Sequence, residues 1–220
     1  MTSQRIAVID FETTGMSPTM GDRATEVAIV MMDNGRVVDR FQSLMNAGVY
    51  IPSFITQLTG ITNAMVQAAP PAETVMREAA RFVGDTPMVA HNASFDRRYW
   101  VAELARAGIE ATHPYACTVL LSRRIYPEAP SHKLGSLVNR LGLPQTGKAH
   151  RAMADAEMAG ELLAHIQKSL RERHRIGNPD HAFLRALQVC SKAAMPKFFA
   201  RCVLDTGKAE SPPAGLSMGQ

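Results

Sequence analysis

The chain has 220 residues, of which 46% are hydrophobic and 20% are charged, enough to bury one globular core and to exclude a largely disordered protein. Its three cysteines, Cys117, Cys190 and Cys202, are too few and too scattered for a disulfide framework or a zinc cluster. The first apolar run begins almost at the amino terminus, and no run has the length of a membrane span. We therefore expect no signal peptide, no membrane contact and a cytoplasmic location.

The formal net charge of +4 is unevenly distributed. Residues 1–167 carry 15 basic and 16 acidic side chains, a net charge of −1, whereas residues 168–220 carry 9 basic and 4 acidic ones, a net charge of +5. A basic carboxyl-terminal segment favours contact with a polyanion, although a solvated helical face explains the same composition.

The first predicted element is the apolar run at 6–9, which is typical of a strand buried on both faces of a sheet. Two further strands are predicted at 25–32 and 37–45. They are joined across Asn34 and Gly35, which favour a tight hairpin turn. The sheet is therefore expected to begin as an antiparallel meander.

The rest of the body predicts short strands that alternate with helices. Strands are expected at 88–90 and 115–117, and helices at 53–58, 63–67, 72–83, 94 or 95 to 107, 118–125, 134–141 and 152–173. This order indicates a mixed α/β sheet with helices packed on it. In the tail, Asn178 is expected to cap a helix with Pro179 in its first turn, and a second helix is expected to begin near Met195.

Asp10 and Glu12 follow the first strand. Because strand side chains alternate between the two faces, these carboxylates point the same way. Side by side they repel each other, and one takes up a proton unless a cation neutralises the pair. Two solvated acids at a strand end fit the same pattern, so a site requires more carboxylates downstream.

Two later segments also place an acid at the start of a helix. Asp96 follows a short apolar strand, where the helix dipole alone explains a carboxylate. Asp155 begins the longest predicted helix, five residues after His150. Five residues on a helix differ by roughly 140° in direction, so these two side chains converge only if His150 lies in the loop before the helix.

Taken together, the segments VIDFETTG at 8–15, VAHNASFD at 89–96 and HRAMAD at 150–155 resemble the three motifs of the DEDDh family of 3′-to-5′ exonucleases. This family includes the proofreading epsilon subunit of bacterial DNA polymerase III. The resemblance covers about residues 4–167. It implies an RNase H-like fold, in which a mixed five-stranded sheet is flanked by helices, here with a helical carboxyl-terminal extension.

From this resemblance we expect an exonuclease domain at 1–167, a basic helical extension at 168–205 and a flexible tail at 206–220. The helices of the extension are expected to pack on the body. They alternatively bind a DNA polymerase, a second copy of the chain, or nucleic acid through Lys192, Lys197 and Arg201.

The resemblance also implies a set of catalytic groups. Two Mg²⁺ ions, replaceable by Mn²⁺, would activate water and brace the departing oxygen. Their ligands would be the four motif carboxylates, Asp10, Glu12, Asp96 and Asp155. His150 would be the general base, because the other branch of the superfamily has a tyrosine four residues before the last aspartate, where this chain has Arg151. His91 is interpreted as a structural residue at a strand end.

Substrate contacts are implied in the same way. The backbone around Phe11, Thr13 and Thr14 would hold the terminal nucleotide. Ile61 would wedge against the last base, although packing of a loop against the core explains this residue equally well. Further contacts to the nucleic acid are expected from Asn92 and Phe95.

The sequence thus predicts a metal-dependent exonuclease that releases nucleoside 5′-monophosphates from single-stranded or mismatched 3′ ends. DNA is favoured over RNA, with a role in proofreading or repair. One alternative is an exoribonuclease that trims RNA 3′ ends, and another is an accessory subunit that docks on a DNA polymerase. A degenerate nucleic-acid-binding module is disfavoured, because no expected ligand is missing.

Overall fold

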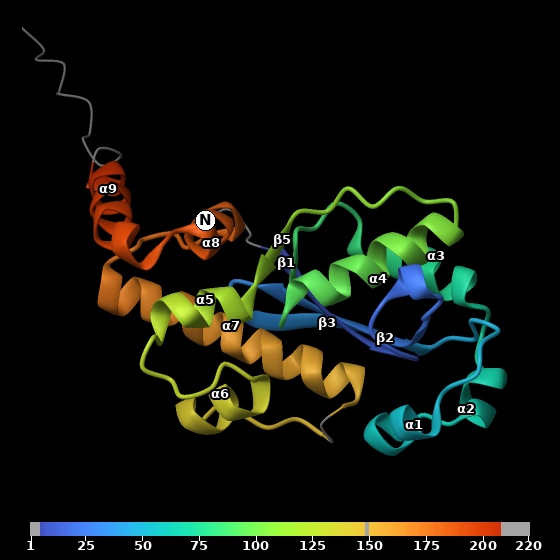
Figure 1. The fold of residues 1–220 in the computed structure, drawn as a ribbon. Helices are drawn as coiled ribbons and strands as arrows, with labels where there is room; N and C mark the ends of the chain where they lie inside the picture. The colour runs from blue at the N-terminus through green and yellow to red at the C-terminus, as the bar shows by residue number, and fades with distance from the viewer. Residues whose placement is uncertain (1–4, 148–149, 208–220) are drawn as a thin grey trace, which may run out of the picture.

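A computed structural model describes residues 5–147 and 150–207. Within these residues five strands form one mixed sheet in the order β3-β2-β1-β4-β5 (Figure 1). The strands are β1 (Arg5–Thr13), β2 (Ala24–Asp33), β3 (Arg36–Leu44), β4 (Met88–Ala90) and β5 (Tyr115–Cys117). β1, β2 and β3 form an antiparallel meander, while β4 runs parallel to β1 and β5 runs parallel to β4. The predicted mixed five-stranded sheet is confirmed.

Helices cover both faces of this sheet, with α3 and α4 on one face and α5, α6 and α7 on the other (Figure 1). The helices are α1 (Ser53–Thr59), α2 (Asn63–Gln67), α3 (Ala72–Val83), α4 (Ala93–Arg106), α5 (Thr118–Ile125), α6 (Leu134–Leu141), α7 (Ala152–His174), α8 (His181–Val189) and α9 (Met195–Gly207), with single 3₁₀ turns at Pro18–Met20 and Lys192–Ala194. No helix of the described segments is both long enough and apolar enough to cross a bilayer.

The two-sided covering explains why residues 6–9 of β1 are apolar at every position. Ile6 and Val8 pack in the core below α5, α6 and α7, and Ala7 and Ile9 pack in the core below α3 and α4. Side chains two residues apart share a face, so Asp10 and Glu12 continue the row of Ile6 and Val8. The sheet therefore directs both carboxylates toward the side that α7 covers.

The carboxyl-terminal extension is continuous with the body, because α7 passes through residue 167 without a break. Leu184 and Leu187 of α8 are buried in the main core. The Gln188 side chain follows the free edge of β5: its Oε1 accepts the Cys117 N–H at 2.7 Å, and its Nε2 donates to the Tyr115 carbonyl at 3.2 Å. The expected packing of the extension on the body is therefore observed for α8.

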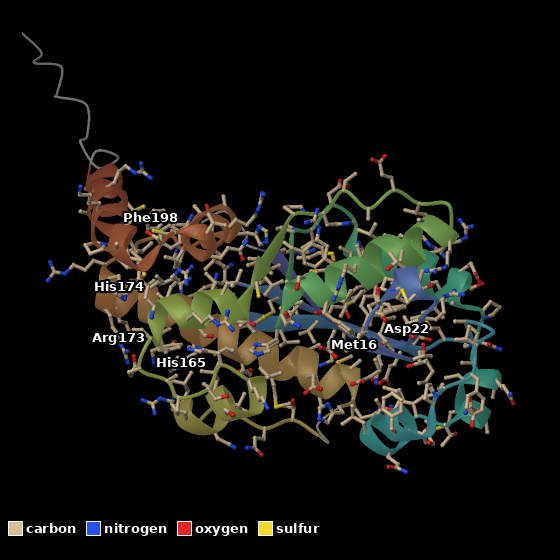
Figure 2. All side chains as sticks on the ribbon, viewed as in Figure 1. Met16, Asp22, His165, Arg173, His174 and Phe198 are labelled. Carbon is tan, nitrogen blue, oxygen red and sulfur yellow. The ribbon has the colours of Figure 1, made fainter. Side chains whose placement is uncertain are left out.

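The start of α8 differs from the expectation. Asp180, rather than Asn178, caps this helix, and its side chain accepts the Phe183 N–H at 2.8 Å. Pro179 therefore precedes the helix and is not part of its first turn. Beyond it, α9 rests against the end of α7, where His174 and Phe199 stack with ring centroids 4.3 Å apart; Figure 2 shows His174 and Phe198 at this junction. Of the expected flexible tail, 206 and 207 belong to α9 and 208–220 lie outside the described residues.

If α8 is part of the core, Leu184→Ala will destabilise the whole chain by about 2–4 kcal/mol, because it removes a fully buried side chain and leaves a cavity. Thermal denaturation followed by circular dichroism measures this. Val189→Ala in the same helix is the control, since Val189 is 76% exposed. Equal melting temperatures for the two variants would show that α8 contributes little to the stability of the body.

Candidate active site

The end of β1 carries the first two acids of the site. Glu12 is buried and Asp10 is partly buried. In the antiparallel pairing of β1 with β2, Glu12 lies directly opposite Glu26. Residues that are directly opposite share a face, so three carboxylates occupy this end of the two strands.

A third element brings Asp96 to the same strand end. Asn92 adopts a left-handed conformation with φ 72°, which turns the chain from β4 directly into α4. Asp96 is 1% exposed in the first turn of that helix. Its Oδ1 accepts the Phe11 N–H at 3.2 Å. Because Phe11 is the residue between Asp10 and Glu12, this bond holds the Asp96 carboxylate beside the end of β1.

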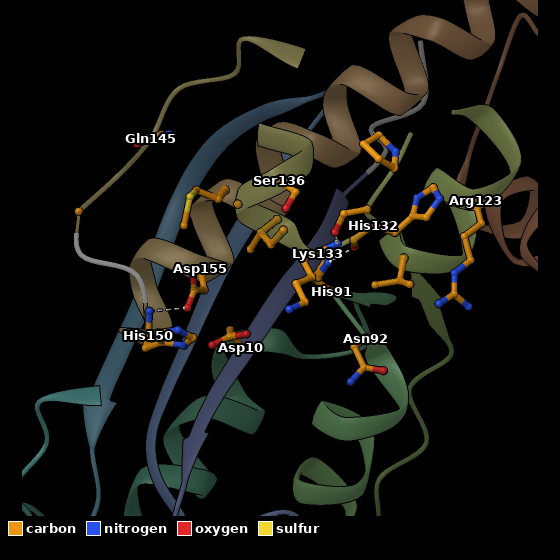
Figure 3. Close-up of a pocket in the computed structure, with 17 residues that line it drawn as sticks. Asp10, His91, Asn92, Arg123, His132, Lys133, Ser136, Gln145, His150 and Asp155 are labelled. Carbon is orange, nitrogen blue, oxygen red and sulfur yellow. Dashed lines mark hydrogen bonds between the residues drawn. The ribbon is translucent and has the colours of Figure 1, made fainter. Parts of the chain in front are cut away.

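The fourth element supplies His150 and Asp155. His150 has a left-handed backbone with φ 61° and precedes α7, so it lies in the loop, as predicted. Its N–H donates to Asp155 Oδ2 at 3.0 Å. Ligand atoms of Glu12, His150 and Asp155 all lie within 4.8 Å of one another, and Figure 3 shows His150, Asp155 and Asp10 gathered at one side of a pocket.

Burial disfavours ionisation of all four carboxylates, and neighbouring acids add to this effect for Asp10 and Glu12. Burial raises the pKa of Asp10 well above its ordinary range, and the neighbouring acids Asp96 and Asp155 raise it further. Burial, followed by the charge of Asp155, raises the pKa of Glu12 to about 8. Burial also raises the pKa of Asp96 to about 8, against the effect of its hydrogen bond from Phe11, and burial raises that of Asp155.

This donor set fits a divalent metal ion. Carboxylate oxygens are the ligands that hard divalent cations prefer, and a buried group of acids without a cation remains partly protonated. The atoms of Glu12, His150 and Asp155 already converge on one small region. Glu12, Asp155 and His150 can therefore hold such an ion together, and Asp10 and Asp96 are further candidate ligands near them.

The motifs did not predict an ion pair beneath the site, between the buried Glu26 and the partly exposed Arg151. Glu26 is 1% exposed and receives both Nε and Nη2 of Arg151, at 3.2 and 2.8 Å. It also accepts the N–H of Ala152, the first residue of α7, at 3.1 Å, and Nε2 of Gln42 at 2.9 Å. The pair fastens the start of α7, and with it His150, to β2. An acid inside a buried apolar strand was the signal, because a buried charge requires a partner.

The expected nucleotide-holding residues of the first motif are engaged in bonds within the protein. The Phe11 N–H donates to Asp96, and the Thr14 N–H donates to the Arg23 carbonyl at 2.9 Å. The Thr13 hydroxyl donates to the Gly15 carbonyl at 2.6 Å, and the Thr14 hydroxyl accepts the Arg23 N–H at 3.0 Å. These bonds shape the turn after β1, part of which Figure 2 marks by Met16 and Asp22. A role in substrate binding stays a prediction.

The other expected contacts lie in different surroundings. Asn92 is exposed and lines the pocket of the site, and Phe95 is half-buried against Tyr99, with ring centroids 5.0 Å apart. Ile61 is fully buried in the small cluster below α1 and α2. The structure therefore does not bring Ile61 to the pocket surface. Leu58, in the same stretch, is 48% exposed.

The raised carboxylate pKa values predict a dependence of stability on pH. Between about pH 7.5 and about pH 8.5 the acids of the unfolded chain are ionised, whereas Glu12 and Asp96, with pKa values of about 8, are still partly protonated when folded. Histidines are neutral in both states over this range, because their ordinary pKa is about 6.5 in the unfolded chain and that of His91 is lowered to about 4 when folded. The metal-free protein will therefore lose stability as the pH rises, by several degrees in melting temperature, roughly 5 °C.

Calorimetry in EDTA measures this decline, and Glu12→Gln, which carries no titrating group at that position, will flatten it. Added Mg²⁺ or Mn²⁺ will raise the melting temperature more at the higher pH, because metal and protons compete for the same oxygens. A melting temperature that rises with pH in EDTA would contradict the prediction.

Acids from β1, α4 and α7 that meet at the end of a mixed five-stranded sheet define a protein of the DEDDh exonuclease type. The family model described as Exonuclease matches residues 7–163, and this chain belongs to that family. The resemblance inferred from the three motifs is thereby confirmed.

Among curated proteins, the chain is 39% identical over 173 residues to the 3′-5′ exonuclease DinG of Bacillus subtilis (strain 168). The matched region covers 78% of this chain and 18% of that protein. It is 35% identical over 174 residues to a PolC-type DNA polymerase III of Bacillus cereus. In this case the matched region covers 79% of this chain and 12% of that protein. The chain thus spans less than a fifth of the length of these relatives.

Among solved structures, Exonuclease X in complex with 5′ overhanging duplex DNA is 28% identical with a TM-score of 0.62, and the match covers 74% of this chain and 92% of that one. The nuclease domain of 3′hExo, a DEDDh family member bound to rAMP, is 17% identical with a TM-score of 0.65. That match covers 76% of this chain and 92% of the 3′hExo chain. Because its sequence identity is only 17%, the match to 3′hExo demonstrates the shared fold alone.

Proposed function

We propose that this chain is a metal-dependent 3′-to-5′ exonuclease that hydrolyses single-stranded or mismatched 3′ ends of DNA and releases nucleoside 5′-monophosphates. The observation that carries the proposal is the convergence of Glu12, His150 and Asp155 within 4.8 Å. The membership of the exonuclease family supports it. A proofreading or repair role follows from the same reaction.

We assign metal binding to Asp10, Glu12, Asp96 and Asp155, which would hold two Mg²⁺ ions, with Mn²⁺ as a substitute. Two divalent ions supply charge neutralisation at the phosphate and a lowered pKa of water. The chain contributes the geometry: the Phe11 amide holds Asp96, and the His150 amide holds Asp155. Because these bonds exist without substrate, the carboxylates need little rearrangement before the reaction.

His150 is assigned as the general base. Its backbone is fixed by the bond to Asp155, while its side chain is exposed at the rim of the pocket. An imidazole in this position accepts a proton from the attacking water and returns it to solvent. Contacts to the terminal nucleotide are assigned to residues of the first and second motifs, namely Phe11, Thr13, Thr14, Asn92 and Phe95, and not to Ile61, which is fully buried away from the pocket.

DNA is the proposed substrate because the similar curated proteins include the 3′-5′ exonuclease DinG and DNA polymerases III of the PolC type. Exonuclease X, the solved structure at 28% identity, contains duplex DNA. An exoribonuclease that trims RNA 3′ ends is the second candidate, because 3′-exonuclease of the same fold has been solved with a histone mRNA stem-loop.

The test uses the purified chain with Mg²⁺ and three 5′-labelled substrates: single-stranded DNA, duplex DNA with a mismatched 3′ end, and RNA. We expect a ladder that shortens from the 3′ end of both DNA substrates, faster than on RNA, and no cleavage in EDTA. Faster cleavage of RNA would replace the DNA assignment with the second candidate. No ladder on any substrate would refute the proposed activity.

A role as an accessory subunit of a DNA polymerase is a further candidate, which the PolC-type relatives favour. The extension from 168 to 205, which includes most of α9, is the segment proposed to dock on a polymerase or on a second copy. Size-exclusion chromatography of the chain, alone and mixed with a purified polymerase subunit, tests both. The cytoplasmic location expected from the sequence stays a prediction.

A further inference from the structure

The pocket of the site extends well beyond the acids. It has a volume of about 1000 Å³ and is lined by Asp10, His150 and Asp155 together with the connection between α5 and α6. Sites that enclose a whole small ligand run from roughly 300 to 1,000 Å³. The pocket therefore has room for more of a substrate than the reacting bond.

Its two walls carry opposite charge. Figure 3 shows Asp10, Asp155 and His150 at one side, Arg123 and His132 at the other, and Lys133 between them. Lys133 and Arg123 are exposed. In the part of the chain that the structure describes, neither forms an ion pair with an acidic side chain. Both cations are thus available to an anion that enters the pocket.

The basic wall is held in place by His91. Its Nε2 lies 3.0 Å from the His132 carbonyl, and its Nδ1 lies 2.9 Å from the Thr118 hydroxyl. Because a carbonyl only accepts, Nε2 carries the proton and Nδ1 accepts from Thr118. Burial lowers the pKa of His91 to about 4, so the ring stays neutral and keeps this arrangement. The residue before Lys133 is therefore anchored to the strand that leads to Asp96.

We propose that Lys133 and Arg123 bind the phosphates on the 5′ side of the scissile bond, an inference that rests on the proposed exonuclease function. A 3′ end has no phosphate beyond its terminal nucleotide, so every phosphate other than the scissile one lies upstream. Lys and Arg contacts to such phosphates set the register of a strand and provide salt-dependent affinity. The acids on the opposite wall repel them, so the strand follows the basic wall.

The test compares Lys133→Ala with the control Lys168→Ala, which removes another exposed lysine. Lys168 lies on α7 thirteen residues beyond Asp155, and hence roughly 20 Å from it along the helix. Two substrates are used: a 5′-labelled single-stranded DNA oligonucleotide, and thymidine 5′-(p-nitrophenyl phosphate), which has a single phosphate. We expect Lys133→Ala to lower kcat/KM on the oligonucleotide roughly tenfold, through KM. The loss on the single-phosphate ester will be much smaller, and Lys168→Ala will change neither.

Binding supplies the second readout. With Asp155→Asn as the background, fluorescence anisotropy of a labelled oligonucleotide at several salt concentrations gives the slope of log affinity against log salt. Lys133→Ala will make that slope shallower by roughly 0.7, the value for one phosphate contact on a single strand. Equal losses on both substrates, or an unchanged slope, would overturn the inference. If the wild type cleaves neither substrate, the proposed function fails, and the slope alone still decides whether Lys133 contacts the strand.

Discussion

Asp155→Asn is expected to reduce 3′-to-5′ cleavage by about 10³-fold. Asparagine keeps an oxygen that can accept the His150 N–H, now at 3.0 Å, so the loop before α7 keeps its position. The charge that would hold a divalent ion is lost. Because burial raises the pKa of Asp155, removal of this carboxylate will leave the melting temperature of the metal-free protein unchanged or higher.

Single-turnover cleavage of 5′-labelled DNA in Mg²⁺ measures the rate, and calorimetry in EDTA measures the stability. Asp39→Asn, which changes an exposed aspartate on β3, is the matched control and will cleave at the wild-type rate. An Asp155→Asn variant with more than about a tenth of the wild-type rate would remove this residue from the catalytic assignment.

Arg151→Ala is expected to lower the free energy of unfolding by about 2–3 kcal/mol, or roughly 5–10 °C in melting temperature. The change leaves the carboxylate of Glu26, which is 1% exposed, without its cation. The arginine is itself 35% exposed, so solvent screens part of the interaction and the expected loss is below that of a fully buried pair. Cleavage will also slow, because the pair holds the start of α7 and the adjoining His150.

Arg40→Ala is the matched control, since Arg40 Nε also joins the sheet to α7, through Glu157 Oε1 at 2.6 Å. That arginine is 53% exposed, and exposed pairs contribute only about 0–1 kcal/mol. Urea denaturation of both variants at one pH gives the comparison. The buried-pair interpretation fails if the two arginine variants unfold at the same urea concentration.

Local patterns in the sequence were sufficient for most of the secondary structure. The meander was predicted from the apolar run at 6–9 and the Asn34-Gly35 turn, and the mixed sheet from the short strands that alternate with helices after residue 70. These features are local, because side-chain periodicity and turn conformations depend on neighbouring residues. The order of the three motifs indicated the family. The extension was less predictable: the helix of residues 181–189 begins after Asp180 instead of Asn178, since either residue type can cap a helix.

The sequence by itself determined the residue types of the candidate site and their order along the chain: two acids after a buried strand, one at the start of a helix, and a histidine five residues before the last acid. Only the tertiary structure decided which groups meet. Arg151 and Glu26 are 125 residues apart in the chain, Phe11 and Asp96 are 85 apart, and Ile61 turns into a separate cluster. Such contacts depend on how strands and helices pack, and no local periodicity encodes that packing.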